Sequence, residues 1–468
     1  MYNIPVMSTQ NYLISTNPAE NYEVVGKVNI STDTEITQAV AAAHNAKKIW
    51  KEIGVAKRVA ILHDLYEKFH ERKEEIVDCI VKETGKTMRF SRVEFDRHSI
   101  DFKWFLDNAQ KALGDKITFE DDKTIHRVVY EPRGVTAVIT PWNHPYGMFV
   151  WGVMPNLVAG NTVIFKISEE CPLVGKLIAD IMASGDLPEG VFTEVYGAGD
   201  VGEKLVNEAI DFIWFTGSSL VGKKVYKIAA NKFIGAVMEL GGSNPAIMFD
   251  DVNTDDFIEK IYQKRFNITC GQSCDALKRL LIQESIFDEV VEKLKKRLDK
   301  VVVGKPDDTK TDLASLVAKR QADLLEAQVT DAIENGAKVE FGGKRPEKLE
   351  GAYFLPTLLT GIKKSMRVWQ EEVFGPVLIA VSFKDEEEAI QLANDTKYGL
   401  GSIIFSKDKA RAKRVASQLE AGNVEINSAI HWLPCNPFGG YKESGMGREH
   451  GEIGLQELCQ IKLISEEK

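Results

Sequence analysis

The first quarter of the chain repeats its hydrophobic residues every three or four positions, which is the spacing of one face of an α-helix. The pattern runs from residue 33 to about residue 113 and includes Ile36 and Val40. Residues 117–131 then alternate between apolar and polar positions around a Glu-Asp-Asp turn. We therefore expect a helical N-terminal region that leads into a β-hairpin.

From Gly134 onward, short β-branched or aromatic runs alternate with helix-like stretches, and Gly, Pro or Asn bounds each run. Strand–helix–strand units at this spacing predict a parallel sheet with helices on both faces, which binds ligands beyond the carboxyl ends of its strands. The strand candidates of this first set lie at residues 134–140, 160–166, 192–197 and 211–217, and the helix candidates at 148–158, 172–184 and 201–208.

After Gly242 a second set of strand candidates indicates another α/β lobe. The tail at residues 454–468 also has a strand pattern, and we expect it to pair with the hairpin at 117–131. The fold class that we predict is α/β, with two Rossmann-like α/β lobes and a small β appendage. The strand candidates of the second set lie at residues 244–249, 279–283, 338–343, 377–383, 401–406 and 422–427.

The composition is that of an ordinary globular protein of 468 residues, since 44% of them are hydrophobic and 27% are charged. The formal charge of −10 argues against nucleic acid or an acidic membrane surface as a partner. No run approaches the roughly 20 apolar residues that cross a bilayer. The first 20 residues lack a basic stretch followed by an apolar core, so we expect no secretion signal and a cytoplasmic location.

Six cysteines lie far apart, which is too sparse for a disulfide framework. Cys270 and Cys274 are four residues apart, but no His or carboxylate cluster adjoins them in the sequence, so we expect no metal site. Cys274 is flanked by small and polar residues and is a candidate nucleophile, although a lone cysteine is more often a small buried apolar residue. Glu239, before a Gly-Gly turn, is a candidate base for the thiol or for a water.

Three polar motifs follow predicted strands of the first set. Asn143 lies in Pro-Trp-Asn-His-Pro, where two prolines fix the direction of the loop, and its ordinary interpretation is an Asx turn. Lys166 and Glu169 have residue types that can hold a ribose, or they simply form an exposed charged turn. Gly217 and Ser218 precede a helix whose free N–H groups could bind phosphate, although a simple N-cap explains them equally well.

The order and spacing of the motifs carry more information than any single one. Seven motifs follow one another at intervals that resemble those of the aldehyde dehydrogenase superfamily, from about residue 15 to residue 465: PWNHP, FKISE, FTGSSLVG, MELGG, GQSC, EEVFGP and NPFGGYKESGMGRE. The resemblance implies an enzyme that oxidises an aldehyde to a carboxylic acid with NAD(P)+. It also implies a cofactor-binding domain at 1–114 and 134–241, a catalytic domain at 242–450 and a β oligomerisation appendage at 115–133 and 451–468.

For catalysis, the resemblance implies that Cys274 attacks the aldehyde to give a thiohemiacetal, which becomes a thioester when the hydride leaves for the nicotinamide. The Asn143 side chain and the Cys274 backbone N–H would stabilise the oxyanion, an effect of roughly 3 kcal/mol per donor. Glu239 would activate the water that hydrolyses the thioester.

For the cofactor, the resemblance implies that Lys166 and Glu169 hold the adenosine ribose, that Ser218 holds the pyrophosphate, and that Glu372 and Phe374 position the nicotinamide ribose and ring. A carboxylate at position 169 suits a free ribose diol, so NAD is expected, and Lys166 with its neighbouring serine leaves NADP as an alternative. The full set of implied cofactor-binding residues is Trp142, Lys166, Ser168, Glu169, Gly217, Ser218, Glu372 and Phe374.

For the substrate, three aromatic rings and a methionine favour an apolar or aromatic aldehyde, with ordinary core packing as the alternative. Arg265 is the nearest candidate for clamping the carboxylate of a semialdehyde, so succinate semialdehyde is an alternative that is not favoured. The substrate-binding residues implied by the resemblance are His144, Met148, Trp151, Trp432 and Phe438.

The chain departs from the family pattern in three places. The interval from Glu239 to Cys274 looks one residue longer than usual. Gly152 lies where many members carry a Lys or Arg that relays protons, which leaves Glu449 and water for any relay. His144 replaces the commoner Phe, and we expect it to make the substrate entrance more polar.

Two other functions remain open. A dehydrogenase that passes the thioester to coenzyme A would not need Glu239, because attack by a thiol requires no activated water. A non-catalytic binding protein with this fold would not need Cys274, Asn143 and Glu239 together. The expected partners are a small aldehyde and further copies of the chain, as a homodimer or homotetramer, because the hairpin and the tail would leave unpaired strand edges in a monomer.

Overall fold

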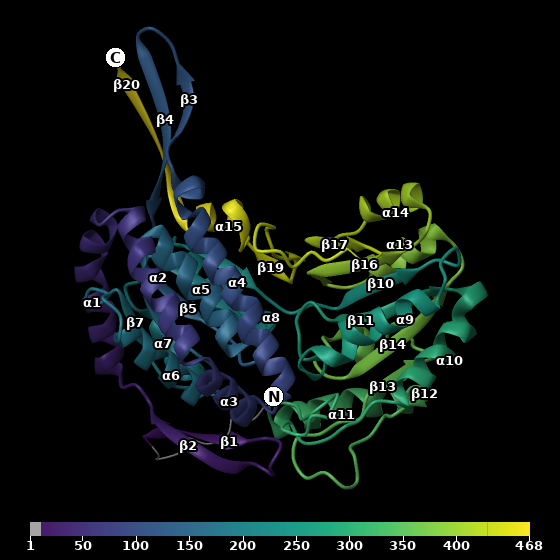
Figure 1. Cartoon of the computed structure of the whole chain (residues 1–468). Helices are drawn as coiled ribbons and strands as arrows, with labels where there is room; N and C mark the ends of the chain where they lie inside the picture. The colour runs from purple at the N-terminus through teal and green to yellow at the C-terminus, as the bar shows by residue number, and fades with distance from the viewer. Residues whose placement is uncertain (1–10, 428) are drawn as a thin grey trace.

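The helical pattern of the N-terminal region folds into a run of helices in the computed structural model, which describes residues 11–427 and 429–468 (Figure 1). The first helix starts with a capping box formed by Thr32 and Glu35. Residues 1–10, which carry part of the N-terminal segment where we expect no secretion signal, lie outside the described residues. The helices are α1 (Asp33–Glu52), α2 (Val55–Glu71), α3 (Lys73–Thr84) and α4 (Met88–Leu113).

The first sheet has the strand order β19-β9-β8-β5-β6-β7 and confirms the predicted parallel arrangement. Its strands pair in parallel except at one edge, where the short β19 pairs antiparallel with β9. The strands are β5 (Val135–Ile139), β6 (Thr162–Lys166), β7 (Phe192–Glu194), β8 (Phe212–Thr216), β9 (Gly235–Glu239) and β19 (Gly445–Met446).

Helices cover both faces of the first sheet, and each face has its own hydrophobic core. Val138 of β5 and Phe149 belong to a core shared with α2 to α6, whereas Ala137 and Leu205 belong to a core shared with α1, α7 and α8. Burial on both faces explains why most of these strands appear in the sequence as largely apolar runs without a regular apolar–polar alternation. The connecting helices are α5 (Pro145–Ala159), α6 (Pro172–Ala183), α7 (Gly199–Asn207) and α8 (Ser219–Lys232).

The second lobe contains a sheet with the order β12-β13-β14-β11-β10-β16-β17, which is parallel except for the edge strand β12. A single core cluster packs around it. The strands are β10 (Asn244–Met248), β11 (Leu277–Gln283), β12 (Lys338–Phe341), β13 (Thr357–Thr360), β14 (Val377–Phe383), β16 (Gly401–Phe405) and β17 (Asn423–Ile426). The helices are α9 (Asp255–Tyr262), α10 (Phe287–Leu298), α11 (Lys319–Glu334), α12 (Arg367–Gln370), α13 (Glu386–Asn394) and α14 (Lys409–Ala416).

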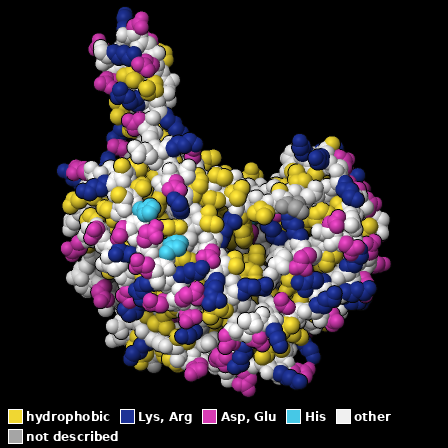
Figure 2. Space-filling model, in the orientation of Figure 1, with side chains coloured by type: hydrophobic (Ala, Val, Ile, Leu, Met, Phe, Trp, Pro, Cys, Tyr) yellow, Lys and Arg dark blue, Asp and Glu magenta, His cyan; other side chains and the backbone are white. Residues whose placement is uncertain are grey.

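The predicted hairpin and the C-terminal strand form an arm that projects from the first lobe (Figure 1). Strands β3 (Lys116–Glu120), β4 (Thr124–Pro132) and β20 (Cys459–Glu467) make an antiparallel sheet, in which β20 pairs along the whole of β4. This confirms the predicted pairing of the tail with the hairpin. Apolar side chains lie on the surface of the arm among charged ones (Figure 2), and they include Ile117 and Ile461.

The strand expected at 454–468 is wrong in its first part, because residues Gly451–Glu457 form helix α15. This helix packs against α4 and buries Leu455, so tertiary contacts decide its structure. The sequence pattern also missed a hairpin of β1 (Tyr12–Asn17) and β2 (Glu23–Asn29), and a short pair of β15 (Tyr398–Gly399) and β18 (Tyr441–Lys442). Within the described ranges, no helix is both long and apolar enough to span a bilayer.

Candidate active site

The three residues predicted to be catalytic come from both sheets. Asn143 follows β5, Glu239 is the last residue of β9, and Cys274 precedes β11. The amide of Asn143 donates a hydrogen bond to the carbonyl oxygen of Gln272 (3.1 Å), which is two residues before the cysteine. The structure therefore brings the Asn143 loop of the first sheet against the loop of the second lobe that carries Cys274.

Cys274 is partly exposed, but its environment disfavours the thiolate. Burial raises the pKa of the thiol well above its usual value, and nearby charges modify that shift. These charges are Asp275, Glu372 and Glu239, which raise the pKa, and Lys278, which lowers it. The resting sulfur is therefore a thiol, and a base must take its proton before it attacks a carbonyl carbon.

Glu239 is buried, and neither carboxylate oxygen has a hydrogen-bond partner among the residues that the structure describes. Burial raises the pKa of Glu239 well above its usual value, and the nearby carboxylate of Glu449 raises it further against the opposing charge of Arg448. A buried carboxylate in this condition is suited to take up a proton and to hold a water or a ligand. Gly439 passes so close that a Cβ there would lie 2.9 Å from Glu239 Oε1, and its φ of +154° also favours glycine.

The side chain of Asn143 is held by a loop with rigid ends. Pro145 occupies the first turn of α5, where its missing N–H costs no hydrogen bond. The amide nitrogen of Asn143 carries two hydrogens, and Gln272 accepts one of them. The other hydrogen can be donated to an oxyanion that forms beside Cys274, so the amide serves the cysteine loop rather than its own turn.

The loop before Cys274 has an irregular backbone. A π-helical turn at Gln263–Asn267 leads into a 3-10 turn at Ile268–Gly271. Thr269, Cys270 and Gly271 have φ values of 45°, 54° and 74°, and such a run of left-handed residues is costly for non-glycine side chains. This is the segment in which we expect an extra residue, and it combines a π-helical turn with a tight reversal of the chain.

The residues predicted to hold the adenosine ribose lie at the carboxyl end of β6. Lys166 is its last residue, and its buried ammonium lies 4.0 Å from Glu169 Oε2 and donates to the carbonyl of Ile167 (3.2 Å). Burial lowers the pKa of Lys166, and Glu169 opposes that shift. Ser168 is buried between them. The structure therefore brings these three predicted residues together, whereas the exposed charged turn considered as the alternative would leave Lys166 in solvent.

The residues predicted to hold the pyrophosphate lie between β8 and α8. Ser218 caps α8 by accepting a hydrogen bond from Val221 N (3.4 Å). Gly217 donates its N–H to the carbonyl of Glu239 (3.0 Å), which ties this turn to the candidate base. The N-cap explanation of Ser218 is therefore correct as local structure, and it leaves the N-terminus of α8 available for an anion.

These residues fit a dinucleotide. Two buried hydroxyls, Thr140 and Thr216, lie at the ends of β5 and β8 and have no hydrogen-bond partner in the described part of the chain. Ribose hydroxyls and phosphate oxygens would supply partners at that edge of the sheet, as ligands of such sheets commonly do. Nearby, Trp142 packs edge-on against Phe374, with 5.5 Å between the ring centroids.

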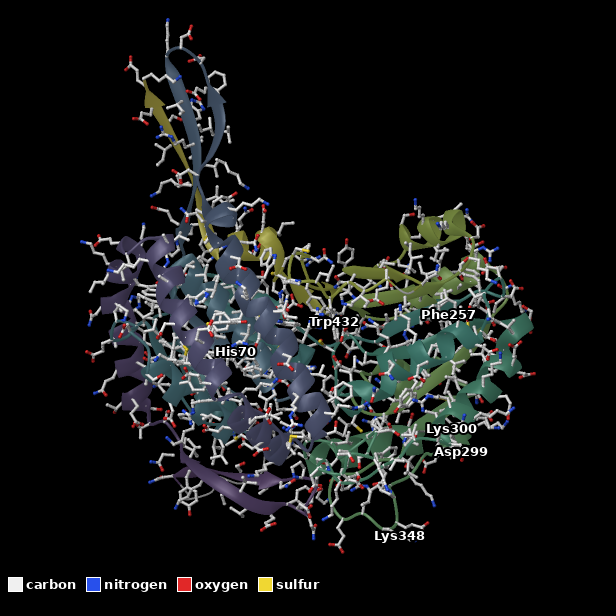
Figure 3. The ribbon with its side chains drawn as sticks, viewed as in Figure 1. His70, Phe257, Asp299, Lys300, Lys348 and Trp432 are labelled. Atoms are coloured by element: carbon white, nitrogen blue, oxygen red, sulfur yellow. The ribbon has the colours of Figure 1, made fainter. Side chains whose placement is uncertain are left out.

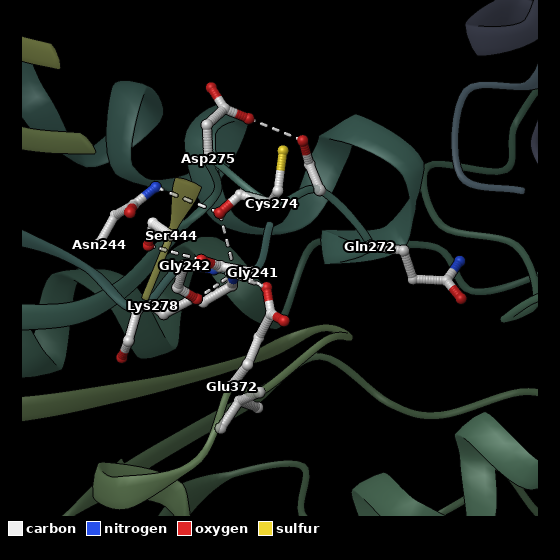
Figure 4. A network of polar contacts seen from close by, with 12 residues as sticks. Gly241, Gly242, Asn244, Gln272, Cys274, Asp275, Lys278, Glu372 and Ser444 are labelled. Carbon is white, nitrogen blue, oxygen red and sulfur yellow. Dashed lines mark hydrogen bonds and ion pairs between the residues drawn. The ribbon is translucent and has the colours of Figure 1, made fainter. Parts of the chain in front are cut away.

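Glu372 meets a residue that sequence reasoning missed. Its carboxylate accepts hydrogen bonds from Gly242 N (3.0 Å) and from the ammonium of Lys278 (2.7 Å), as Figure 4 shows. The close packing leaves no room at Gly241, where a Cβ would lie 2.2 Å from Glu372 Oε2. The signal in the sequence was a strand, LKRLLIQ, with two cations among apolar residues. A buried cation of this kind needs a partner, but the sequence does not say which one.

Three of the residues predicted to line the substrate site, Trp151, Trp432 and Phe438, belong to one wall of aromatic rings. Trp151 lies 6.0 Å from Phe438, which stacks on the ring of His431 at 5.9 Å. Trp432 lies near the junction of the lobes (Figure 3) and is partly exposed, whereas Met148 is buried.

Imidazole groups make this wall more polar than the aromatic rings alone indicate. His98 and His450 pack edge-on against Trp151 at 5.0 and 4.3 Å, and His144 lies 5.8 Å from His98. Trp151 donates its indole N–H to Asp101 Oδ2 (2.8 Å). Burial lowers the pKa of His450 to about 4, so this ring is neutral near pH 7. His98, Asp101 and His450 were not anticipated, because His98 and Asp101 lie in a helical segment outside the sequence motifs and His450 directly follows the last motif.

Arg265 cannot act as the carboxylate clamp considered in the sequence. Its guanidinium is fully buried and donates to backbone carbonyls, among them Val377 O (2.7 Å) and Val373 O (3.0 Å). It ties the cysteine loop, through Gly271 O (3.4 Å), to the segment at Val373 and Val377 instead. Gly152 is also constrained, because a Cβ there would lie 2.6 Å from Val138 Cγ1 and 2.7 Å from the Trp214 ring. A lysine does not fit at position 152 in this structure.

Comparisons with known proteins agree with this geometry. The sequence model described as the aldehyde dehydrogenase family matches residues 6–464. Betaine aldehyde dehydrogenase of Bacillus subtilis is 36% identical over 451 residues, which cover 95% of this chain and 92% of that protein. A putative aldehyde dehydrogenase of Staphylococcus aureus is 37% identical over 465 residues, covering 98% and 96% of the two chains.

Solved structures give the same answer. Betaine aldehyde dehydrogenase from Staphylococcus aureus in complex with NAD+ superposes with a TM-score of 0.93 at 35% identity, over 98% of this chain and 92% of that chain. An NADP-dependent enzyme of E. coli also gives a TM-score of 0.93, at 32% identity over 98% and 95% of the two chains. Together with the arrangement of thiol, amide and buried carboxylate, these matches show that the chain belongs to the aldehyde dehydrogenase family.

Proposed function

We propose that this NAD(P)-dependent aldehyde dehydrogenase releases its product by hydrolysis, with Cys274 as nucleophile, Asn143 as oxyanion donor and Glu239 as base. The observation that carries the proposal is the buried Glu239 carboxylate, which lies in the electrostatic environment of Cys274 and accepts no hydrogen bond from the described residues. A thioester that passes to coenzyme A would not require such a base.

The first half of the reaction needs a thiolate and an oxyanion site. Because the pKa of Cys274 is raised, its proton leaves for Glu239 or for a water beside it as the sulfur approaches the carbonyl carbon. The oxygen of the resulting thiohemiacetal then accepts hydrogen bonds from Asn143 Nδ2 and from the backbone N–H of Cys274. These donors lie on loops that are already fixed, so little reorganisation is required.

The second half of the reaction begins with an acyl group on the sulfur as a thioester. Glu239 takes a proton from a water, and the water oxygen attacks the thioester carbonyl carbon. The C–S bond then breaks, the carboxylic acid leaves and the sulfur recovers its proton. Before it acts on the water, Glu239 must give up any proton that it took from the thiol, and the buried Glu449 carboxylate, whose charge raises the pKa of Glu239, is the candidate acceptor.

The cofactor would be held by the residues at the carboxyl ends of the first sheet. Lys166 and Glu169 would hold the adenosine ribose, Ser218 the pyrophosphate, and Glu372 with Phe374 the nicotinamide end. When bound there, the nicotinamide supplies the acceptor for the hydride that the oxidation releases. The carboxylate of Glu169 favours a free ribose diol and thus NAD, and the proximity of Lys166 leaves NADP as the alternative.

For the substrate, we propose a neutral aldehyde with an aliphatic or aromatic body. Betaine aldehyde, which names two of the relatives, carries a quaternary ammonium that binds best to the open faces of aromatic rings. In this chain, however, Arg97 and Lys264 already lie over Trp432, at 5.9 and 5.4 Å from the ring centroid. Further positive charge at that ring is disfavoured.

An aldehyde panel tests these proposals. Reduced cofactor should appear with NAD+ and hexanal or benzaldehyde without coenzyme A, and betaine aldehyde should be a poorer substrate. Reduction only in the presence of coenzyme A would replace hydrolysis by acyl transfer. An absence of reduction with every aldehyde and with both NAD+ and NADP+ would make the protein a non-catalytic member of the family.

We also propose that the first lobe is the cofactor-binding domain, the second lobe the catalytic domain, and the arm a subunit contact. Strands β3 and β20 are the edges of the arm's sheet, and Phe119 and Leu463 are exposed there. Such edges are commonly covered in an assembly. Light scattering should give the mass of a homodimer or a homotetramer, whereas a monomeric mass would contradict this role for the arm.

A further inference from the structure

Lys278 is a buried lysine between the candidate nucleophile and the nicotinamide side of the site. It is the second residue of β11, and its side chain is 1% exposed. Its ammonium donates three hydrogen bonds, to Gly242 O (2.6 Å), to Cys274 O (3.0 Å) and to Glu372 Oε1 (2.7 Å). Figure 4 shows the ammonium at the centre of these contacts. All three hydrogens of the ammonium are therefore in use.

The next residue along the strand shows that a buried cation does not need a carboxylate here. Arg279 is also buried, and among the described residues its guanidinium donates to backbone carbonyls alone, those of Ser243 (2.9 Å), Leu392 (2.8 Å) and Ala393 (2.7 Å). Lys278 instead selects one carboxylate and the carbonyl of the candidate nucleophile. Two adjacent cations of one strand thus differ in their partners, although protein oxygens accept hydrogen bonds from both.

The contacts of Lys278 join two loops that are far apart in the sequence. Gly242 lies just after Glu239 and donates its N–H to the same oxygen of Glu372 that accepts from Lys278. The carbonyl of Cys274 also accepts a weaker hydrogen bond from Asn244 Nδ2 (3.4 Å). A movement of Glu372 would therefore be transmitted through one ammonium to the backbone of Cys274.

Lys278 also supplies a positive charge that favours the thiolate form of Cys274. Asp275, Glu372 and Glu239 all raise the pKa of Cys274, and the ammonium of Lys278 lowers it. Arg265 is the other buried cation that acts on Lys278, and it is occupied by carbonyls of the cysteine loop and of the adjoining second-lobe segment. Loss of the lysine would leave the thiol among carboxylates.

We propose that Lys278 is a positioning residue that fixes the Glu372 carboxylate for the nicotinamide ribose and at the same time orients Cys274 and favours its thiolate. The part that concerns Glu372 rests on the proposed cofactor role of that residue. The part that concerns Cys274 does not, because it depends only on the charge and hydrogen bonds around the sulfur.

The first test measures the reactivity of the sulfur without turnover. The rate of iodoacetamide labelling of Cys274 is followed across pH by mass spectrometry, which separates this cysteine from the other five. Lys278→Met should move the midpoint of labelling to higher pH by about one unit, because the stabilising charge is lost. An unchanged midpoint would overturn the proposal for Cys274.

The second test is a double-mutant cycle on the affinity for NAD+, measured by calorimetry. Lys278→Met should weaken NAD+ binding about tenfold, the size expected when a hydrogen bond to a charged group is lost. In the Glu372→Gln background the same substitution should have almost no effect, since its target carboxylate is gone. Equal losses in both backgrounds would show that Lys278 does not act through Glu372.

Arg279→Met is the matched control, because it removes a buried cation of the same strand that touches neither Cys274 nor Glu372. It should lower thermal stability while leaving the labelling midpoint and the affinity for NAD+ unchanged, and a shift equal to that of Lys278→Met would overturn the proposal. If Lys278→Met does not fold, Glu372→Gln is compared with Lys278→Met/Glu372→Gln, since the double variant leaves no unpaired charge at position 372. Labelling should still differ between these two. Neither the labelling test nor the binding test requires an aldehyde, so a failure of the proposed aldehyde oxidation can be told apart from a failure of this proposal.

Discussion

Two carboxylates act on the candidate nucleophile, the buried Glu239 and the partly buried Glu372, and their surroundings differ. Glu239 accepts no hydrogen bond from any described residue, and the charge that acts on it most strongly is another carboxylate, Glu449. Glu372 accepts hydrogen bonds from an ammonium and from a backbone N–H, at 2.7 and 3.0 Å. The first carboxylate lies at the end of a strand in one lobe, and the second lies in a loop of the other.

This difference separates two kinds of work that one residue type can do. A base must gain and lose a proton near neutral pH, so weak stabilisation of its charge is useful. A group that only holds a ligand is better fixed by a counter-charge that keeps its geometry. The surroundings of Glu239 match the first task and those of Glu372 match the second, and substitutions on each side should therefore give different phenotypes.

The largest effect is expected at the sulfur that the two sides share. Cys274→Ala should abolish aldehyde oxidation, because no other group can form the covalent intermediate. Affinity for NAD+ should remain within about twofold of the parent, since the alanine keeps the backbone hydrogen bonds of the loop. Cofactor fluorescence and calorimetry measure the two quantities, and residual turnover near the parental rate would reject Cys274 as nucleophile.

On the Glu239 side, Glu239→Gln should lower the steady-state rate by about 100-fold to 10,000-fold, the usual contribution of a general base. The first turnover should survive, so stopped-flow fluorescence should show a burst of reduced cofactor followed by a stall as the thioester accumulates. Steady turnover at the parental rate would remove Glu239 from the hydrolysis step. Loss of the burst as well would place its main role in activating the thiol.

On the Glu372 side, Glu372→Gln should behave differently. We expect the KM for NAD+ to rise about tenfold because a charged acceptor is lost, while turnover at saturating NAD+ changes little. No burst and stall should be seen, because hydrolysis does not depend on this residue. A stall like that of Glu239→Gln would erase the proposed difference between the two carboxylates.

The smallest expected effect is a shift in the pH dependence of hydrolysis, and it concerns Glu239 alone. The ionised form of Glu239 is the base, and Glu449 raises the pKa of Glu239, so hydrolysis should increase with pH through a midpoint above the usual carboxylate range. Glu449→Gln removes the like charge and should move that midpoint to lower pH by about one unit. The pH profile of the steady-state rate measures the shift, and a move to higher pH would contradict the assigned sign.

Much of the fold could be predicted from the sequence because its parallel strands are buried on both faces. Runs such as residues 135–139 and 377–383 are apolar apart from Thr136 and Ser382, so their positions were predicted to within a few residues. Helix α15 was assigned as strand because its seven residues are too few to show a helical period. Contact with α4 decides its structure, and no local pattern records that contact.

The residues of the candidate site also fall into those that the sequence predicts and those that it does not. The residues in sequence motifs could be named because motif order and spacing carry them. The structure places the Asn143 amide against the cysteine loop and Glu239 among the charges that act on Cys274. Lys278 was missed because its partner Glu372 lies 94 residues away, and a lysine in a strand resembles a surface residue until the sheet is assembled. The interpretation of Arg265 failed for the same reason, since its carbonyl partners are set by the loop geometry.

The close packing of Gly152 against Trp214 limits which substitutions these two positions can accept. A side chain at position 152 would collide with the indole, and inserting bulk into such a packed site typically costs about 1–3 kcal/mol. Replacing Trp214 by alanine first would leave a cavity and would lower the stability of the fold by about 3–5 kcal/mol. Neither single step is neutral, and Val138 Cγ1 would lie 2.6 Å from a Cβ at position 152, so a side chain there requires changes at both Val138 and Trp214.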